Sequence, residues 1–177
     1  MRDYHSEADK VRDLPQVMQY INGRVADICC GHDKILPDAI GIDGRDLPGV
    51  DIVTDDLVTL WAVDKLGSET CDTLFSSHYL EHSHEPSYLI TCWLNCLKKG
   101  GHLVIYMPDK AHYNNHDNPE HLFNWSYEDF LFFFKRTFCG EGKDFRGNHL
   151  DKLLELVDSG MDVRENCYSF YIVAKKV

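Results

Sequence analysis

The chain has 177 residues, of which 44% are hydrophobic and 12% aromatic, and its formal net charge is −11. This length and apolar content suit one domain with a continuous core and exclude a disordered chain. Because the negative charge repels phosphate backbones, the composition disfavours broad nucleic-acid binding and favours a small or neutral substrate.

The N-terminus and the cysteines indicate the compartment. No apolar run reaches the roughly 18 residues needed to cross a bilayer, and the first residues lack the apolar block of a signal peptide. The seven cysteines stand at irregular positions, which is typical of reduced thiols rather than of a disulfide framework. We therefore expect a soluble, cytoplasmic protein that does not enter the membrane.

Short β-type runs alternate with helical runs along the first half of the chain, which predicts an α/β fold. Apolar side chains at helical spacing predict a leading helix over residues 6–22, despite Pro15. A second helix is expected at 57–66. Buried strands are predicted at 24–29 (RVADIC), 39–43 (AIGID), 51–54 (DIVT) and 72–77 (DTLFSS).

The second half continues the alternation. A helix from Pro86 to Leu97 ends at the glycines of LKKGG, and residues 102–108 (HLVIYMP) are apolar on both faces, as in a central parallel strand. Ser126 caps a helix over 126–138, with Asp129 in the box position. Further runs predict a helix at 150–160 (LDKLLELVDSG) and a hairpin of strands at 162–167 (DVRENC) and 169–176 (SFYIVAKK).

Polar residues gather where the first four predicted strands end. In doubly wound sheets, ligands bind outside the carboxyl ends of the strands. An acid at the second strand end suits the two hydroxyls of a ribose, and a glycine in the first turn lets the backbone approach a ligand. The sequence therefore predicts an adenosine-containing cofactor. The strand ends carry Asp27 with Gly31, then Asp43, then Asp55 and Asp56, and finally Ser76, Ser77 and His78.

Four stretches together resemble class I S-adenosylmethionine-dependent methyltransferases of the small, single-domain kind, similar to type 11. They are ADICCGHDK, GIDGRDLPGVDIVTDDL, DTLFSSHYLEH and LKKGGHLVIYMPD. Of the family's acidic-x-Gly-x-Gly-x-Gly turn only Gly31 remains, with Cys29 and Asp33 at the outer positions, where a positive φ would cost energy. The short crossover from Lys34 to Asp43 matches family members with K-x-P-x-A-I-G-x-D after the turn.

The resemblance implies a Rossmann-like, seven-stranded, mostly parallel sheet with a C-terminal antiparallel hairpin and helices on both faces. It implies S-adenosylmethionine as the cofactor. Asp27 and Gly31 would face the methionyl part, Asp43 the ribose, and Asp55 or Asp56 the adenine. Ser77 and His78 would lie near the sulfonium, and Cys29 and Ser76 complete the expected cofactor-binding set.

On the acceptor side, His78 is the candidate base if the acceptor must lose a proton. The function expected is methyl transfer to a small-molecule or sugar-type acceptor.

Residues 1–177 are expected to form a single domain, divided into an N-terminal helix or lid (1–23), a cofactor-binding core (24–108), a substrate loop (109–125) and C-terminal helices with the hairpin (126–177). The substrate candidates are Glu81, His82, His112, Tyr113 and His121.

Structural explanations stand beside these roles. Asp43 could be a solvated turn residue, Asp27 a cap, and one of Asp55 and Asp56 the N-cap of the following helix. His78 could be a buried histidine that is hydrogen-bonded to backbone. The histidines at 112, 116 and 121 are expected to be solvated loop residues, and no metal is predicted.

Two other functions compete with methyl transfer. His78, Glu81 and His82 spell H-x-x-E-H, a zinc-protease signature that requires one continuous helix. Here the three residues follow the strand predicted at 72–77 and precede Pro86, so we expect them to lie in the segment where the chain leaves that strand rather than on one helix. The second competitor is a methyltransferase-like fold that has lost catalysis and serves as a binding scaffold, as the missing outer glycines would allow.

Overall fold

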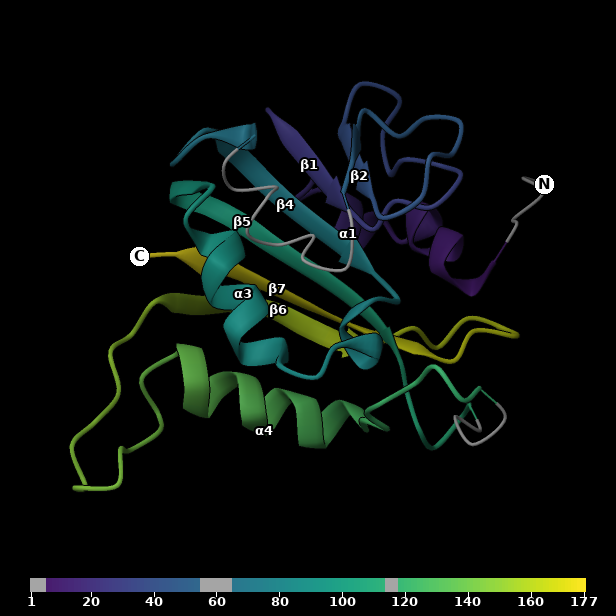
Figure 1. The fold of residues 1–177 in the computed structure, drawn as a ribbon. Helices are drawn as coiled ribbons and strands as arrows, with labels where there is room; N and C mark the ends of the chain where they lie inside the picture. Colours follow the sequence, from purple (N-terminus) through teal and green to yellow (C-terminus); the bar gives the residue numbers. More distant parts are fainter. Residues whose placement is uncertain (1–5, 55–64, 114–117) are drawn as a thin grey trace.

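The computed structural model describes residues 6–54, 65–113 and 118–177. Its centre is a seven-stranded sheet with the strand order β3-β2-β1-β4-β5-β7-β6 (Figure 1). Strands β1 to β5 are parallel, β7 is antiparallel to β5, and β6 is antiparallel to β7. The predicted sheet is thereby confirmed. Its strands are β1 (Val25–Ile28), β2 (Ile40–Asp43), β3 (Ile52–Val53), β4 (Cys71–Ser77), β5 (Leu97–Pro108), β6 (Leu154–Met161) and β7 (Ser169–Lys176).

The strand order reverses beside β1. The chain first builds outward from β1 to β2 and β3, then returns to the other side of β1 with β4. In the β1–β4 pair, Asp27 lies opposite Phe75 and Ile28 lies opposite Ser76. The carboxyl ends of these two strands therefore share one edge of the sheet, where such folds form a ligand crevice.

Helices cover both faces of the sheet, as predicted. The helices α3 (Pro86–Leu94) and α4 (Tyr127–Phe138) lie on one face, and the 3-10 helix η1 (Glu7–Asp13) and α1 (Pro15–Met18) lie on the other (Figure 1). Successive strand side chains point to opposite faces, so each face has its own core. The α3 and α4 side buries Trp93, Leu103, Ile105, Phe130 and Phe134. The η1 and α1 side buries Val11, Leu14, Val17, Val104 and Tyr106.

The N-terminal helix predicted over 6–22 is two short pieces. Leu14, just before Pro15, has φ −103° and ψ 90°, which is not helical. The proline ring disfavours the helical region for the residue before it, so η1 ends there and α1 restarts with Pro15 at its first position. Residues 29–39, between β1 and β2, contain no helix, in keeping with the short crossover.

The C-terminal prediction was partly wrong. From Leu154 onward, the segment predicted as a helix over 150–160 forms β6, and the predicted strand 162–167 is the connection between β6 and β7. The apolar residues of LLELV fit both helical and strand periodicity. The backbone groups along the open edge of β7 need partners, and pairing with β6 supplies them.

Two further boundaries differ from the predictions. The helix expected from Pro86 to Leu97 ends at Leu94, and β5 begins at Leu97 rather than at residue 102. Residues 57–64 of the helix predicted at 57–66 lie outside the described residues. Within the described part of the chain, no helix is long and apolar enough to cross a bilayer.

Candidate functional site

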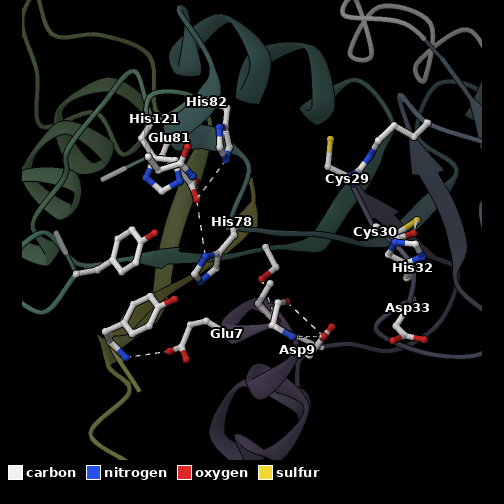
Figure 2. A pocket seen from close by; sticks show the side chains of 18 residues that line it. Glu7, Asp9, Cys29, Cys30, His32, Asp33, His78, Glu81, His82 and His121 are labelled. Carbon is white, nitrogen blue, oxygen red and sulfur yellow. Dashed lines mark hydrogen bonds and ion pairs between the residues drawn. The ribbon is translucent and has the colours of Figure 1, made fainter. Parts of the chain in front are cut away.

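A cavity of about 410 Å³ opens at the carboxyl ends of β1 and β4 (Figure 2). Its wall is built from segments far apart in the sequence. They are residues 6–9 of the N-terminal segment, the turn at 29–33 after β1, the exit of β4 with Ser77, His78, Glu81 and His82, and the side chains of Arg45, Tyr113, Asn118, His121 and Tyr168.

The turn after β1 has the backbone that its glycine motif suggests. Cys29 has φ +60° and Gly31 has φ +61°, whereas Asp33 is not among the described non-glycine residues with positive φ. A Cβ added at Gly31 would meet nothing within 4 Å. The turn therefore presents open main chain to the cavity, which suits close approach of a ligand.

Within this turn, Cys29 is the non-glycine residue with a strained, positive φ. This strain predicts different effects on stability for glycine at position 29 and glycine at position 33. A non-glycine residue at positive φ costs about 1–2 kcal/mol, and glycine's extra chain entropy costs about 0.5–1 kcal/mol. Cys29→Gly relieves the strain but also loses the packing of the Cys29 side chain against the core, so we expect its stability to change by less than about 0.3 kcal/mol, whereas Asp33→Gly should destabilise the fold by about 0.5–1 kcal/mol. Urea unfolding of both variants measures this, and equal shifts of the same sign would contradict it.

Asp27 lies beneath the turn rather than in its open wall. It is buried, and its Oδ2 accepts a hydrogen bond from the backbone N–H of Ile35 at 2.5 Å. Loss of water raises the pKa of this carboxyl to about 7, against the lowering effect of the Ile35 N–H and of Arg12. Asp27 thus braces the crossover, and it borders a small hollow of about 30 Å³ behind the main cavity.

This burial predicts a pH dependence of stability. The folded pKa of about 7 lies above the ordinary value of 3.8, so the folded state retains a proton that the unfolded state has lost. The stabilisation is fully present below about pH 4 and is lost as the pH rises through about 7, falling by about 1.4 kcal/mol between about pH 6 and about pH 8. Asp27→Asn should therefore lose about 1.4 kcal/mol less stability than the wild type over this interval, because the other buried acid, Glu81, titrates in both proteins. Urea unfolding of both proteins at the two pH values measures it, and parallel slopes would contradict the assignment.

Asp43, at the end of β2, is buried behind Arg45 and does not itself line the cavity; it holds the turn from its other side. Its Oδ2 accepts from the Gly31 N–H at 2.9 Å, and its Oδ1 accepts from the Arg45 N–H at 3.0 Å and from Arg45 Nε at 3.1 Å. Burial alone would raise the pKa of Asp43, but these donors outweigh it and hold the pKa below its ordinary value. Asp43 is therefore ionised. The sequence analysis did not name Arg45, which lines the cavity. A basic residue two positions after an acid at a strand end could have predicted an ion pair at this place.

The two serines at the end of β4 point to opposite sides. Ser77 lines the cavity, and its hydroxyl donates to the backbone oxygen of Ala8 at 3.0 Å, which ties the N-terminal segment to the site. Ser76 is buried beneath, and its Oγ has no hydrogen-bond partner among the described residues. Of this predicted pair, only Ser77 lies in the cavity wall.

His78 stands at the centre of the cavity wall (Figure 2) with φ +49°. Its Nε2 lies 2.9 Å from Ser169 Oγ, and that hydroxyl donates to Glu7 Oε1 at 3.1 Å. Because the hydroxyl hydrogen is already used, the network assigns the Nε2–H tautomer and leaves a lone pair on Nδ1. Burial lowers the pKa of His78 to about 3, so the ring is neutral. Sequence reasoning did not name Glu7 or Ser169.

The remaining substrate candidates divide into two groups. Glu81 and His82, in the 3-10 helix η2 (Leu80–His82), join Tyr113 and His121 at the cavity. His112 lies instead beside a separate hollow near residues 161–167, with its Nδ1 3.1 Å from Asp109 Oδ1. Asp55 and Asp56 lie outside the described residues.

The zinc-protease helix is not formed. His78 precedes η2 and has a left-handed backbone, so the two histidines and Glu81 do not share one helix. Glu81 Oε1 nevertheless lies 3.8 Å from His78 Nδ1 and 4.0 Å from His82 Nε2. Burial raises the pKa of the Glu81 carboxyl to about 8.

The strand order and the cavity at the β1 and β4 ends define a Rossmann-like protein of the class I methyltransferase type. A family model described as a methyltransferase domain matches residues 6–155. The chain belongs to this methyltransferase family, and the predictions of the family and of S-adenosylmethionine as its cofactor are confirmed. The open main chain at Gly31 and the acid at the end of β2 fit that cofactor.

Solved structures share the fold. A SAM-dependent methyltransferase from Archaeoglobus fulgidus is 19% identical, with a TM-score of 0.65 over 97% of this chain and 95% of that one. A SAM-dependent methyltransferase from Thermotoga maritima is 14% identical, with a TM-score of 0.64 over 97% and 90%. The Burkholderia thailandensis 1,6-didemethyltoxoflavin-N1-methyltransferase, with bound substrate and S-adenosylhomocysteine, is 11% identical, with a TM-score of 0.62 over 97% and 79%. No curated protein matches the chain by sequence.

Proposed function

We propose that the chain transfers the methyl group of S-adenosylmethionine to a small-molecule acceptor, sugar-type acceptors included, held in the cavity at the ends of β1 and β4. One observation carries this proposal: a single cavity joins the turn at 29–33 to the polar and aromatic side chains beyond β4. Its volume of about 410 Å³ is in the range of small-molecule sites.

The cofactor side of the cavity is assigned to residues on the first two strands. The main chain around Gly31 faces the methionyl part, and the ionised Asp43 accepts hydrogen bonds from the ribose. Arg45 turns away from Asp43 Oδ1 when the ribose takes its place. Ser77 and His78 border the sulfonium. The cofactor supplies an already activated methyl group, so the residues act chiefly by positioning.

The acceptor side is assigned to the aromatic and histidine side chains opposite the turn. The rings of Tyr113 and Tyr168 are stacked, with centroids 4.7 Å apart and an interplanar angle of 17°. His121 lies beside them, its ring centroid 5.7 Å from that of Tyr113. Such faces suit a flat ring or the apolar face of a sugar. His78 Nδ1 is the acceptor for a proton that the acceptor molecule loses. Because a pKa of about 3 makes His78 a weak base, this role requires the nearby Glu81 carboxyl, whose Oε1 lies 3.8 Å from Nδ1, to stabilise the imidazolium that forms.

The N-terminal segment is proposed as the cover of this site. Residues 6–9 line the cavity, and hydrogen bonds from Ser77, Tyr168 and Ser169 hold them there. Ser77 Oγ donates to Ala8 O, and the Tyr168 N–H donates to Glu7 Oε1 at 2.9 Å. A cover of this kind excludes water from the reacting atoms.

A transfer assay tests the proposal. The purified protein is incubated with S-adenosylmethionine that carries an isotope label in the methyl group and, in parallel, with the small-molecule, protein and nucleic-acid fractions of a cell extract. We expect label in a small molecule together with release of S-adenosylhomocysteine. Label in protein or nucleic acid would overturn the acceptor class. Cofactor binding without transfer to any fraction would favour the scaffold function instead.

A further inference from the structure

A second constellation lies in the same cavity, on the side away from the turn. Glu81, His82 and His121 each offer one ligand atom, and the three atoms lie within 4.8 Å of one another. Figure 2 shows the three side chains converging, well apart from Cys29 and Cys30. We propose that Glu81, His82 and His121 bind a divalent transition-metal ion.

The carboxylate of Glu81 is the strongest reason. The residue is only 1% exposed, and neither Oε1 nor Oε2 has a hydrogen-bond partner among the described residues. A buried carboxylate is normally paired, hydrogen-bonded or bound to a metal. The imidazoles of His78 and His82 lie 3.8 Å and 4.0 Å from Oε1, beyond hydrogen-bond distance, and the ligand atoms of Glu81, His82 and His121 lie within 4.8 Å of one another. A cation between these groups would give the carboxylate the partner that it lacks.

His82 is oriented as metal-binding histidines usually are. Its Nδ1 lies 2.9 Å from the backbone oxygen of Glu120, to which the Nδ1–H donates. The lone pair is then on Nε2, the atom nearest to Glu81. A hydrogen bond from the far ring nitrogen to a carbonyl is the usual support that fixes the tautomer of a ligand histidine.

The backbone brings His121 to this pair. The N–H groups of Leu122 and Phe123 donate to the backbone oxygen of Glu81 at 2.8 Å and 3.0 Å. The rings of His82 and His121 meet edge to face, with centroids 4.6 Å apart. Ligands from β4's exit and from the loop after β5 are thus fixed against each other by main-chain bonds, although they are far apart in the sequence.

The ligand types select the kind of ion. Two imidazoles and one carboxylate suit Zn²⁺, Co²⁺ or Fe²⁺, whereas Mg²⁺ and Ca²⁺ prefer oxygen ligands. The thiols across the cavity are poor competitors, because burial raises the pKa of Cys30 to about 12 and that of Cys29 well above its ordinary value. The sequence analysis predicted no metal, and it did not consider Glu81, His82 and His121 together as a set of ligands.

Three protein ligands leave coordination positions open, and the cavity lies on that side. If the chain is the methyltransferase proposed above, these positions would hold an oxygen or nitrogen atom of the acceptor. The acceptors favoured are then small molecules with a hydroxyl, carboxylate or amine that coordinates such an ion. This last step rests on the proposed function, whereas metal binding itself does not.

Calorimetric titration of the chelator-treated protein with Zn²⁺, without S-adenosylmethionine, tests the site. We expect one ion per chain in the wild type. Loss of a group that only hydrogen-bonds to a metal ligand costs about 10–100-fold in metal affinity, so loss of a ligand itself in Glu81→Gln or His121→Ala should weaken Zn²⁺ binding by about 100-fold or more. Substituting Co²⁺ for Zn²⁺ should give an absorption spectrum without thiolate-to-metal bands.

His149→Ala is the matched control. The Nδ1 of His149 also contacts a backbone oxygen, that of Gly140 at 3.3 Å, but it is not part of the three-residue cluster. The affinity of the His149→Ala variant for Zn²⁺ should equal that of the wild type. Wild-type affinity in Glu81→Gln, or no Zn²⁺ binding by the wild type, would overturn the metal site. S-adenosylmethionine titrated in the presence of chelator reports separately on the proposed function.

Discussion

Replacement of Asp43 by alanine should weaken S-adenosylmethionine binding by more than about tenfold. Hydrogen bonds to a charged group contribute about 1.5–3 kcal/mol each, and 1.4 kcal/mol corresponds to tenfold in affinity. Asp43 is ionised, and it also orders the turn through the Gly31 N–H. The variant should therefore lose both the proposed ribose contact and a brace of the turn after β1. Calorimetric titration of the variant and the wild type measures the change.

Two companion variants sharpen this result. Asp46→Ala removes an exposed acid from the same loop and should leave the affinity unchanged, which controls for charge alone. Asp43→Asn keeps an oxygen for the Gly31 N–H but loses the charge, so its affinity should fall between those of the wild type and of Asp43→Ala. Wild-type affinity in Asp43→Ala would remove Asp43 from the cofactor site.

Replacement of His78 by alanine should reduce turnover by about 100-fold while cofactor affinity changes by less than about threefold. A positioned proton acceptor contributes about 10²–10⁴-fold to rate. His78 is neutral, lines the cavity, and has its Nδ1 lone pair free of the Ser169 bond. Turnover is measured with the acceptor that the labelling assay identifies, and affinity is measured by calorimetry.

His78→Asn separates a chemical role from a structural one. Asparagine tolerates the positive φ of this position better than most residues. It cannot take a proton. We expect His78→Asn to fold like the wild type and to show the low turnover of the alanine variant. An active asparagine variant would show that His78 serves the fold alone.

The sheet was predictable because its strands are short apolar runs separated by turn residues and because their ends carry polar side chains. The exception, β6, shows where this reasoning stops. Leu153, Leu154, Leu156 and Val157 fit a helix and a strand equally well, and pairing with β7 decides between them. No local pattern contains that information, since the partner strand follows later in the chain.

The site was predictable to the extent that parallel strands end at one edge. Cys29, Gly31, Ser77 and His78 meet there, as that rule requires. The rule does not say which of two adjacent serines faces the cavity, because β4 is buried on both faces and its sequence shows no alternation of polar and apolar residues. Glu7 and Ser169 were missed for another reason: they come from the two ends of the chain and meet His78 only in the folded protein.

Titration of the wild-type protein with S-adenosylmethionine, in the presence of a chelator, tests the central claim most directly. We expect saturable binding of one cofactor per chain, with an affinity that the Asp43→Ala variant weakens. Absence of binding up to about millimolar cofactor would contradict the assignment of the cavity at β1 and β4.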